Sequence, residues 1–134
     1  MAKTRIGTNA QFVGPNQGLS TIGDHCYGLS GSFSFTDTVA YGLNFSTGKG
    51  YIEAKIYFGY HDPSGDNVET HVVFNNQIVF QAESNQSLSG DFPNGFAHLK
   101  IIIPPYTTVK IGAINVSNSN AHTSTISLTG KVYA

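Results

Sequence analysis

The chain has 134 residues, a formal net charge of -1 and only 11% charged residues, whereas a typical soluble domain has about 25%. This length suits one domain that buries roughly two-thirds of the surface exposed by the unfolded chain. The sparse cations argue against electrostatic binding of nucleic acid, so no nucleic-acid partner is expected. No apolar run approaches the ~20 residues that span a membrane, so no membrane partner is expected either.

Residues 1–18 are the least regular part of the sequence, with scattered apolar residues among Thr, Asn, Gln, Gly and Pro. They alternate too weakly for an inner strand, so we expect an extended N-terminal arm, followed by a β-sandwich domain over 19–134. The arm is expected to order on a partner surface. Its contact residues would be Lys3, Arg5, Ile6, Phe12 and Val13. A tail without a role and an edge strand are the alternatives.

The single cysteine, Cys26, allows no intramolecular disulfide and is expected to be a small buried hydrophobe. From residue 27 onward, apolar and polar residues alternate with a period of two, and no segment keeps a helical stripe. The clearest case is 51–60, "YIEAKIYFGY", which places Ile52, Ala54, Ile56, Phe58 and Tyr60 on one face. In the last strand, Ile126, Leu128 and Val132 are expected to point inward. The pattern predicts an all-β chain.

The opposite face of 51–60 carries Tyr51 and Tyr57. Sugars stack on exposed aromatic rings, so this pair is a candidate glycan-binding face. The alternative is cross-strand packing or a subunit interface. Together with Val79, these outward residues and the low net charge predict self-association, with a homotrimer as the expected form.

The segment "HDPSGDNVE" offers three carboxylates, Asp62, Asp66 and Glu69, as oxygen ligands for calcium. Their spacing is not that of an EF-hand. The alternative is a polar hairpin loop in which Pro63 and Gly65 set the turn. The loop is the favoured interpretation, so no metal or other cofactor is expected.

The next segment, "VETHVVFNNQIVFQAE", reads as a hairpin. A two-residue loop at Asn75 and Asn76 would pair Phe74 with Gln77 and turn the second strand's apolar residues outward. A three-residue loop over 75–77 would pair Phe74 with Ile78 instead. The sequence therefore predicts a three-residue loop with one left-handed residue and an inward Ile78.

The segment "KIIIPPYTTVKIG" places two prolines between two apolar strands. Proline offers no N–H to a sheet, so Pro104 and Pro105 predict a stiff corner where the chain leaves one sheet for another. Beyond it, Val109, Ile111 and Ala113 share one face while Ile114 and Val116 share the other, which predicts a bulge near Gly112 and Ala113.

About eight such strands without a helix to cover a sheet predict an antiparallel, jelly-roll-like β-sandwich. The sequence has no nucleophile elbow, nucleotide-binding glycine motif or HExxH, and its five histidines are scattered. No catalytic residues are therefore expected, and the chain is not expected to be an enzyme.

The last third, "AHLKIIIPPYTTVKIGAINVSNSNAHTSTISLTGKVYA", resembles the end of small capsid decoration (cement) proteins of tailed bacteriophages. The resemblance implies a structural virion protein, made in the host cytoplasm. Such a protein binds the major capsid protein on the outside of the head, often as a trimer, and stabilises contacts between capsomers. The alternative is a carbohydrate- or receptor-binding β-sandwich module of a phage tail.

Overall fold

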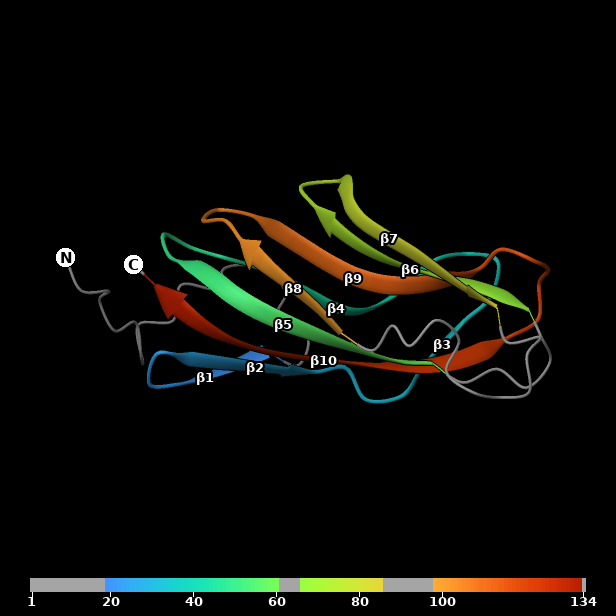
Figure 1. Ribbon diagram of the computed structural model, residues 1–134, viewed down its shortest axis with the longest axis horizontal. Coiled ribbons are helices and arrows are strands. Elements are labelled where there is room, and N and C mark those ends of the chain that lie inside the picture. The colour runs from blue at the N-terminus through green and yellow to red at the C-terminus, as the bar shows by residue number, and fades with distance from the viewer. Residues whose placement is uncertain (1–18, 61–65, 86–97, 134) are drawn as a thin grey trace.

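The computed structural model describes residues 19–60, 66–85 and 98–133 (Figure 1). In these ranges it contains ten strands, and no helix there is long and apolar enough to cross a membrane. The strands are β1 (Leu19–Ile22), β2 (His25–Leu29), β3 (Phe33–Phe35), β4 (Ala40–Ser46), β5 (Tyr51–Tyr60), β6 (Asn67–Phe74), β7 (Gln77–Asn85), β8 (His98–Ile103), β9 (Thr108–Asn115) and β10 (His122–Tyr133). The all-β prediction is confirmed.

The strands form two antiparallel sheets that pack face to face (Figure 1). Sheet I has the order β1-β2-β10-β5-β8, and β3 also pairs with β10; sheet II has the order β4-β9-β6-β7. The sets β2-β10-β5-β8 and β4-β9-β6-β7 have the strand order of a jelly roll, in which the chain crosses repeatedly between the sheets. The jelly-roll prediction is confirmed. The two strands beyond the expected eight are β1, which forms a hairpin with β2, and β3.

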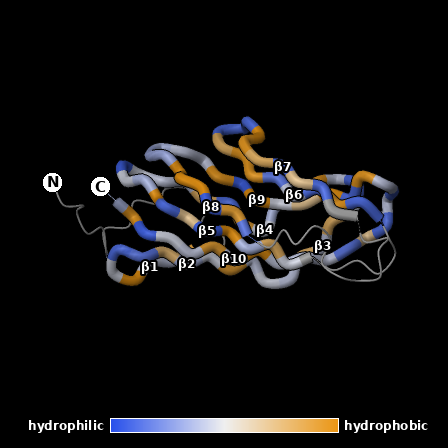
Figure 2. Tube along the Cα trace, in the orientation of Figure 1, coloured by the Kyte–Doolittle hydropathy of each residue, from blue (hydrophilic) through white to orange (hydrophobic). Residues whose placement is uncertain are grey.

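The core lies between the sheets because alternate residues along the strands are buried there. Figure 2 marks where hydrophobic residues fall along each strand. Ile52, Ala54, Ile56 and Phe58 of β5 are buried, as are Ile126, Leu128 and Val132 of β10, as predicted. Across the core they meet buried side chains of sheet II, among them Leu43, Phe45, Val72, Val109 and Ile111. Cys26 is fully buried in the same cluster.

The Pro104–Pro105 corner joins β8 of sheet I to β9 of sheet II, as predicted. Two buried threonines tie it to the loop after β4: Thr47 Oγ1 donates to the Pro104 carbonyl at 2.7 Å, and Thr107 N donates to Thr47 Oγ1 at 2.9 Å. The Tyr106 amide donates to the Gly48 carbonyl at 2.7 Å. The corner is therefore fixed by hydrogen bonds as well as by proline rings.

The prediction for the β6–β7 hairpin is wrong. The loop has two residues, Asn75 and Asn76, both left-handed (φ 51° and 67°), and Phe74 pairs with Gln77. This is the conformation that two-residue hairpins favour, and asparagine tolerates it. The register is corrected inside the hairpin, where a bulge at Val79 lets Phe80 return to the core. Ile78 consequently faces outward and is 48% exposed.

The bulge expected near Gly112 and Ala113 lies in the partner strand instead. Strand β9 pairs with β6 without interruption, whereas Gly42 of β4 is the extra residue opposite β9. A Cβ at Gly42 would lie 2.7 Å from the Phe33 ring, so a glycine fits this close approach. Ile114 and Val116 simply continue the outward face, while Asn115 takes the inward position and is buried.

Candidate functional site

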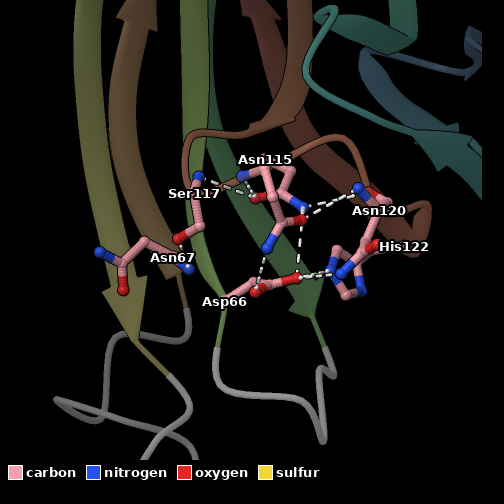
Figure 3. Close-up of polar contacts among 7 residues, drawn as sticks. Asp66, Asn67, Asn115, Ser117, Asn120 and His122 are labelled. Carbon is pink, nitrogen blue, oxygen red and sulfur yellow. Dashed lines mark hydrogen bonds and ion pairs between the residues drawn. The ribbon is translucent and has the colours of Figure 1, made fainter.

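At the end of the sandwich that carries the β9–β10 loop, a buried carboxylate gathers several polar side chains (Figure 3). Asp66, just before β6, lies next to the end of β9 because Val68 pairs with Asn115. Asn118 Nδ2 donates to Asp66 Oδ1 at 2.7 Å, and His122 Nε2 lies 2.8 Å from Asp66 Oδ2. Asn115 and Asn120 donate to Oδ2 at 3.4 Å. We call these five residues the Asp66 cluster.

The Asp66 cluster surrounds its carboxylate with donors rather than with oxygen ligands for a cation. The amide orientations follow from the backbone: Asn115 Oδ1 accepts from Ser117 N at 2.9 Å, and Asn118 Oδ1 accepts from Asn120 N at 2.9 Å. Their amide nitrogens must then point to Asp66. Hydrogen bonds, from His122 first and Asn118 next, lower the pKa of Asp66 from its ordinary value of 3.8 to about 2. The arrangement anchors the β9–β10 loop.

The three carboxylates proposed for calcium do not come together among the described residues. Asp66 points into its cluster, whereas Glu69 lies on the other face of β6, where His71 Nε2 is 2.9 Å from its Oε1. Asp62 lies outside the described residues. In the part of the chain that the structure describes, no group of three or more His, Cys, Asp or Glu side chains is placed to hold a metal ion. Pro63 and Gly65, which would set the turn of the alternative hairpin loop, also lie outside the described residues.

A groove crosses the outer face of sheet I, with a cavity volume of about 560 Å³. Its lining comes from four neighbouring strands: His25 and Tyr27 of β2, residues 53–55 of β5, 100–102 of β8 and 129–131 of β10. The pairing register aligns one row of outward side chains across the whole sheet: Ser20, Tyr27, Thr129, Lys55 and Lys100. The short Thr129 side chain stands between the larger Tyr27 and Lys55, so the surface is low along the middle of this row.

Three of the five lysines that the structure describes line this groove. Lys131 is 4.0 Å from Asp24, which also contacts His25 at 2.9 Å. Glu53, the only acidic residue in the described lining, accepts a hydrogen bond from the Tyr133 hydroxyl at 2.9 Å. Lys55 and Lys100 pair directly across β5 and β8, and neither has an ion-pair partner among the described residues. Among the described residues, the groove therefore holds a cationic pair without an ion-pair partner.

Tyr51 and Tyr57 both face outward, but they do not form one surface. Six residues of strand separate them by roughly 20 Å. Tyr51 stacks on Tyr133 at a centroid distance of 5.0 Å, and Tyr57 lies 5.7 Å from the His98 ring. Each ring has its own cross-strand neighbour, which is the alternative that the sequence left open. The proposed arm residues Lys3, Arg5, Ile6, Phe12 and Val13 lie outside the described residues.

Sequence reasoning missed the groove because it depends on register between strands that are distant in the chain. Lys55 was visible as an outward residue of β5, and alternation in "HLKIII" places Lys100 outward. Nothing local shows that the two face each other. For Cys26, burial raises the pKa of its thiol to about 12, which makes it unreactive and supports its role as a core residue.

No protein-family model matches the sequence, and a search of curated proteins finds no match. Among solved structures, the chain is similar to a beta-glucosidase from Paenibacillus barengoltzii, with 10% sequence identity and a TM-score of 0.37. The similarity covers 74% of this chain and 10% of that one, so the chain spans about a tenth of that protein's length. So low a TM-score carries no argument about function.

Proposed function

We propose that the chain is a non-enzymatic virion protein that decorates a phage capsid, binding the major capsid protein on the outer surface of the head and stabilising contacts between capsomers. The observation that carries this proposal is the exposure and left-handed backbone of Tyr106. The residue is 75% exposed, and its backbone is left-handed at φ 53°. A bulky residue in this region is a genuine outlier, and such strain concentrates at contact and active sites.

Tyr106 is part of a larger apolar tip, which we define as Pro104, Pro105, Tyr106, Ile78 and Val79. All five are exposed. The β6–β7 hairpin is held beside the corner because Thr108 N donates to Asn75 Oδ1 at 2.8 Å and Asn75 N donates to the Thr108 carbonyl at 2.9 Å. Exposed apolar groups on a rigid support suit a protein–protein contact, because little ordering cost opposes binding.

The tip alone would bind weakly. A fully buried large apolar side chain contributes roughly 1.5–3 kcal/mol, whereas association costs an estimated 4–15 kcal/mol. A homotrimer whose three tips engage symmetry-related sites on a head would overcome this by avidity. The proposal therefore includes trimerisation and a contribution from the arm, residues 1–18.

The test uses the variant Tyr106→Gly and purified heads of a phage that carries the gene. Glycine relieves the left-handed strain, so the variant should be at least as stable as the parent while it co-sediments with heads at least ~5-fold more weakly. Val116→Ala, which removes an exposed apolar side chain outside the tip, is the matched control and should bind normally. Undiminished binding by Tyr106→Gly would remove the tip from the proposal, and no binding by the parent chain would reject capsid decoration.

A second function, a carbohydrate- or receptor-binding module, is favoured by the groove on sheet I. Its volume falls within the range of roughly 300–1,000 Å³ that is usual for ligand sites, and it combines an aromatic ring with several polar side chains. Glycan-array binding that is lost in Tyr27→Ala but kept in Tyr106→Gly would support this function. The two functions are compatible because the groove and the tip occupy different parts of the surface.

A further inference from the structure

The cationic pair in the groove is costly unless something neutralises it. Like charges directly opposite on neighbouring strands destabilise a sheet, and Lys55 and Lys100 are such a pair. The nearest carboxylate in the lining is that of Glu53, which accepts a hydrogen bond from Tyr133. Tyr133 lies diagonal to Glu53 on the side away from Lys55, so this hydrogen bond draws the carboxylate away from the lysine pair. The third lysine, Lys131, has Asp24 beside it. An anion supplied from outside the described residues would remove the repulsion.

We propose that the groove binds an anionic oligosaccharide, with its carboxylate or sulfate groups on Lys55 and Lys100. The remainder of the same row suits a sugar chain. Thr129 offers a hydroxyl for hydrogen bonding, and Tyr27, a residue that is 42% exposed, offers an aromatic ring. Three inter-strand spacings separate Tyr27 from Lys100, or roughly 14 Å. One short chain lying across the strands can therefore meet the ring, the hydroxyl and both ammonium groups.

The size and lining of the site suit a short glycan chain. The groove has the volume of a ligand site, and its lysine and threonine side chains stand beside exposed apolar groups such as Ile102, a combination that matches the polar edges and apolar faces of sugar rings. The proposal rests on the second function above and supplies its ligand class. It does not depend on capsid decoration.

The experiment is isothermal titration calorimetry of the whole chain with an octameric oligogalacturonate and with the same oligomer after full methyl esterification. Esterification keeps the sugar rings and removes the charge. The acid should bind at least about tenfold more tightly than the ester, because a hydrogen bond to a charged group contributes about 1.5–3 kcal/mol. A heparin-derived octasaccharide tests sulfate groups in the same way, and binding of either acid should weaken as salt is raised.

The variant Lys55→Gln/Lys100→Gln should lose at least about tenfold in affinity for the acidic probe. It should melt no lower than the parent, since the repulsion is gone. Lys110→Gln is the matched control: it removes one charge from sheet II, where Lys110 lies over the Tyr41 ring, and should leave affinity unchanged.

Four results would overturn the proposal. The first three are equal affinity for acid and ester, full-strength binding by the double variant, and no binding of either acidic probe. The fourth is tighter binding of a poly-glutamate peptide of equal charge, which would assign the groove to an acidic protein segment and reject the glycan class. Head binding by the double variant reports on capsid decoration separately. Loss of glycan binding with retained head binding therefore supports both proposals at once.

Discussion

Adjacent residues of β10 should differ sharply in their effect on stability, because one faces the core and the next faces the groove. Leu128 is 1% exposed and pairs with Ile56 and Gly28, whereas Thr129 is exposed. Leu128→Ala removes three carbons, which costs about 2.4 kcal/mol at about 0.8 kcal/mol per CH₂, and the cavity left behind adds about 1 kcal/mol. The free energy of unfolding should therefore fall by about 3–4 kcal/mol.

This loss is large enough to measure by either heat or urea. The entropy of unfolding at Tm is about 0.28 kcal/mol per kelvin for a chain of this length, so Tm should fall by about 11–14 °C. Thr129→Ala should change Tm by less than about 2 °C. Far-ultraviolet circular dichroism at a fixed protein concentration follows both, which keeps any self-association constant. The assigned faces of β10 are wrong if Leu128→Ala lowers the free energy of unfolding by less than about 1 kcal/mol. They are also wrong if Thr129→Ala lowers it by more than Leu128→Ala does.

Three other variants test other parts of the fold. The pKa of Asp66 is lowered to about 2 in the folded state, so the contribution of Asp66 to stability is complete above about pH 4 and is lost as the pH falls towards 2. The Tm difference between the parent and Asp66→Asn should therefore shrink over that range. A constant Tm difference would contradict this role of Asp66. Gly130→Ala would place a Cβ 2.6 Å from Ile52 Cγ2, so urea unfolding should show a loss of roughly 1–3 kcal/mol; an unchanged midpoint would mean that the core yields there. Replacing Pro104 and Pro105 by alanine should cost roughly 1–2 kcal/mol through the unfolded state, with the same near-ultraviolet spectrum; an altered spectrum would show that the corner itself has moved.

The parts of the fold that follow from local pattern were predictable from the sequence. Alternation in 51–60 identified the inward residues of β5, because a half-buried strand must place its apolar side chains on one face. The two prolines at 104 and 105 marked the crossing between sheets for an equally local reason, the missing N–H of proline.

The errors arose where two local rules compete or where the partner lies far away in sequence. At Asn75–Asn76, the preference of a tight turn for left-handed residues outweighed the expected register, and the bulge at Val79 absorbed the difference. The candidate sites depend on distant pairs: Asp66 meets His122 across 56 residues, and Lys55 meets Lys100 only through the β5–β8 register. No periodicity within one segment contains that information.

The position of β10 has a consequence for how the molecule is made. This strand follows every other strand of sheet I in the chain, yet it lies between β2 and β5, and the Ile126 amide donates to the Ser30 hydroxyl across 96 residues. Until β10 arrives, β2 and β5 have exposed backbone edges, which are templates for pairing between chains. Such non-local pairing folds on the slow scale of milliseconds to seconds. Release of residues 122–133 from the ribosome is therefore the step that commits the chain to folding, and before it the nascent protein is most vulnerable to aggregation.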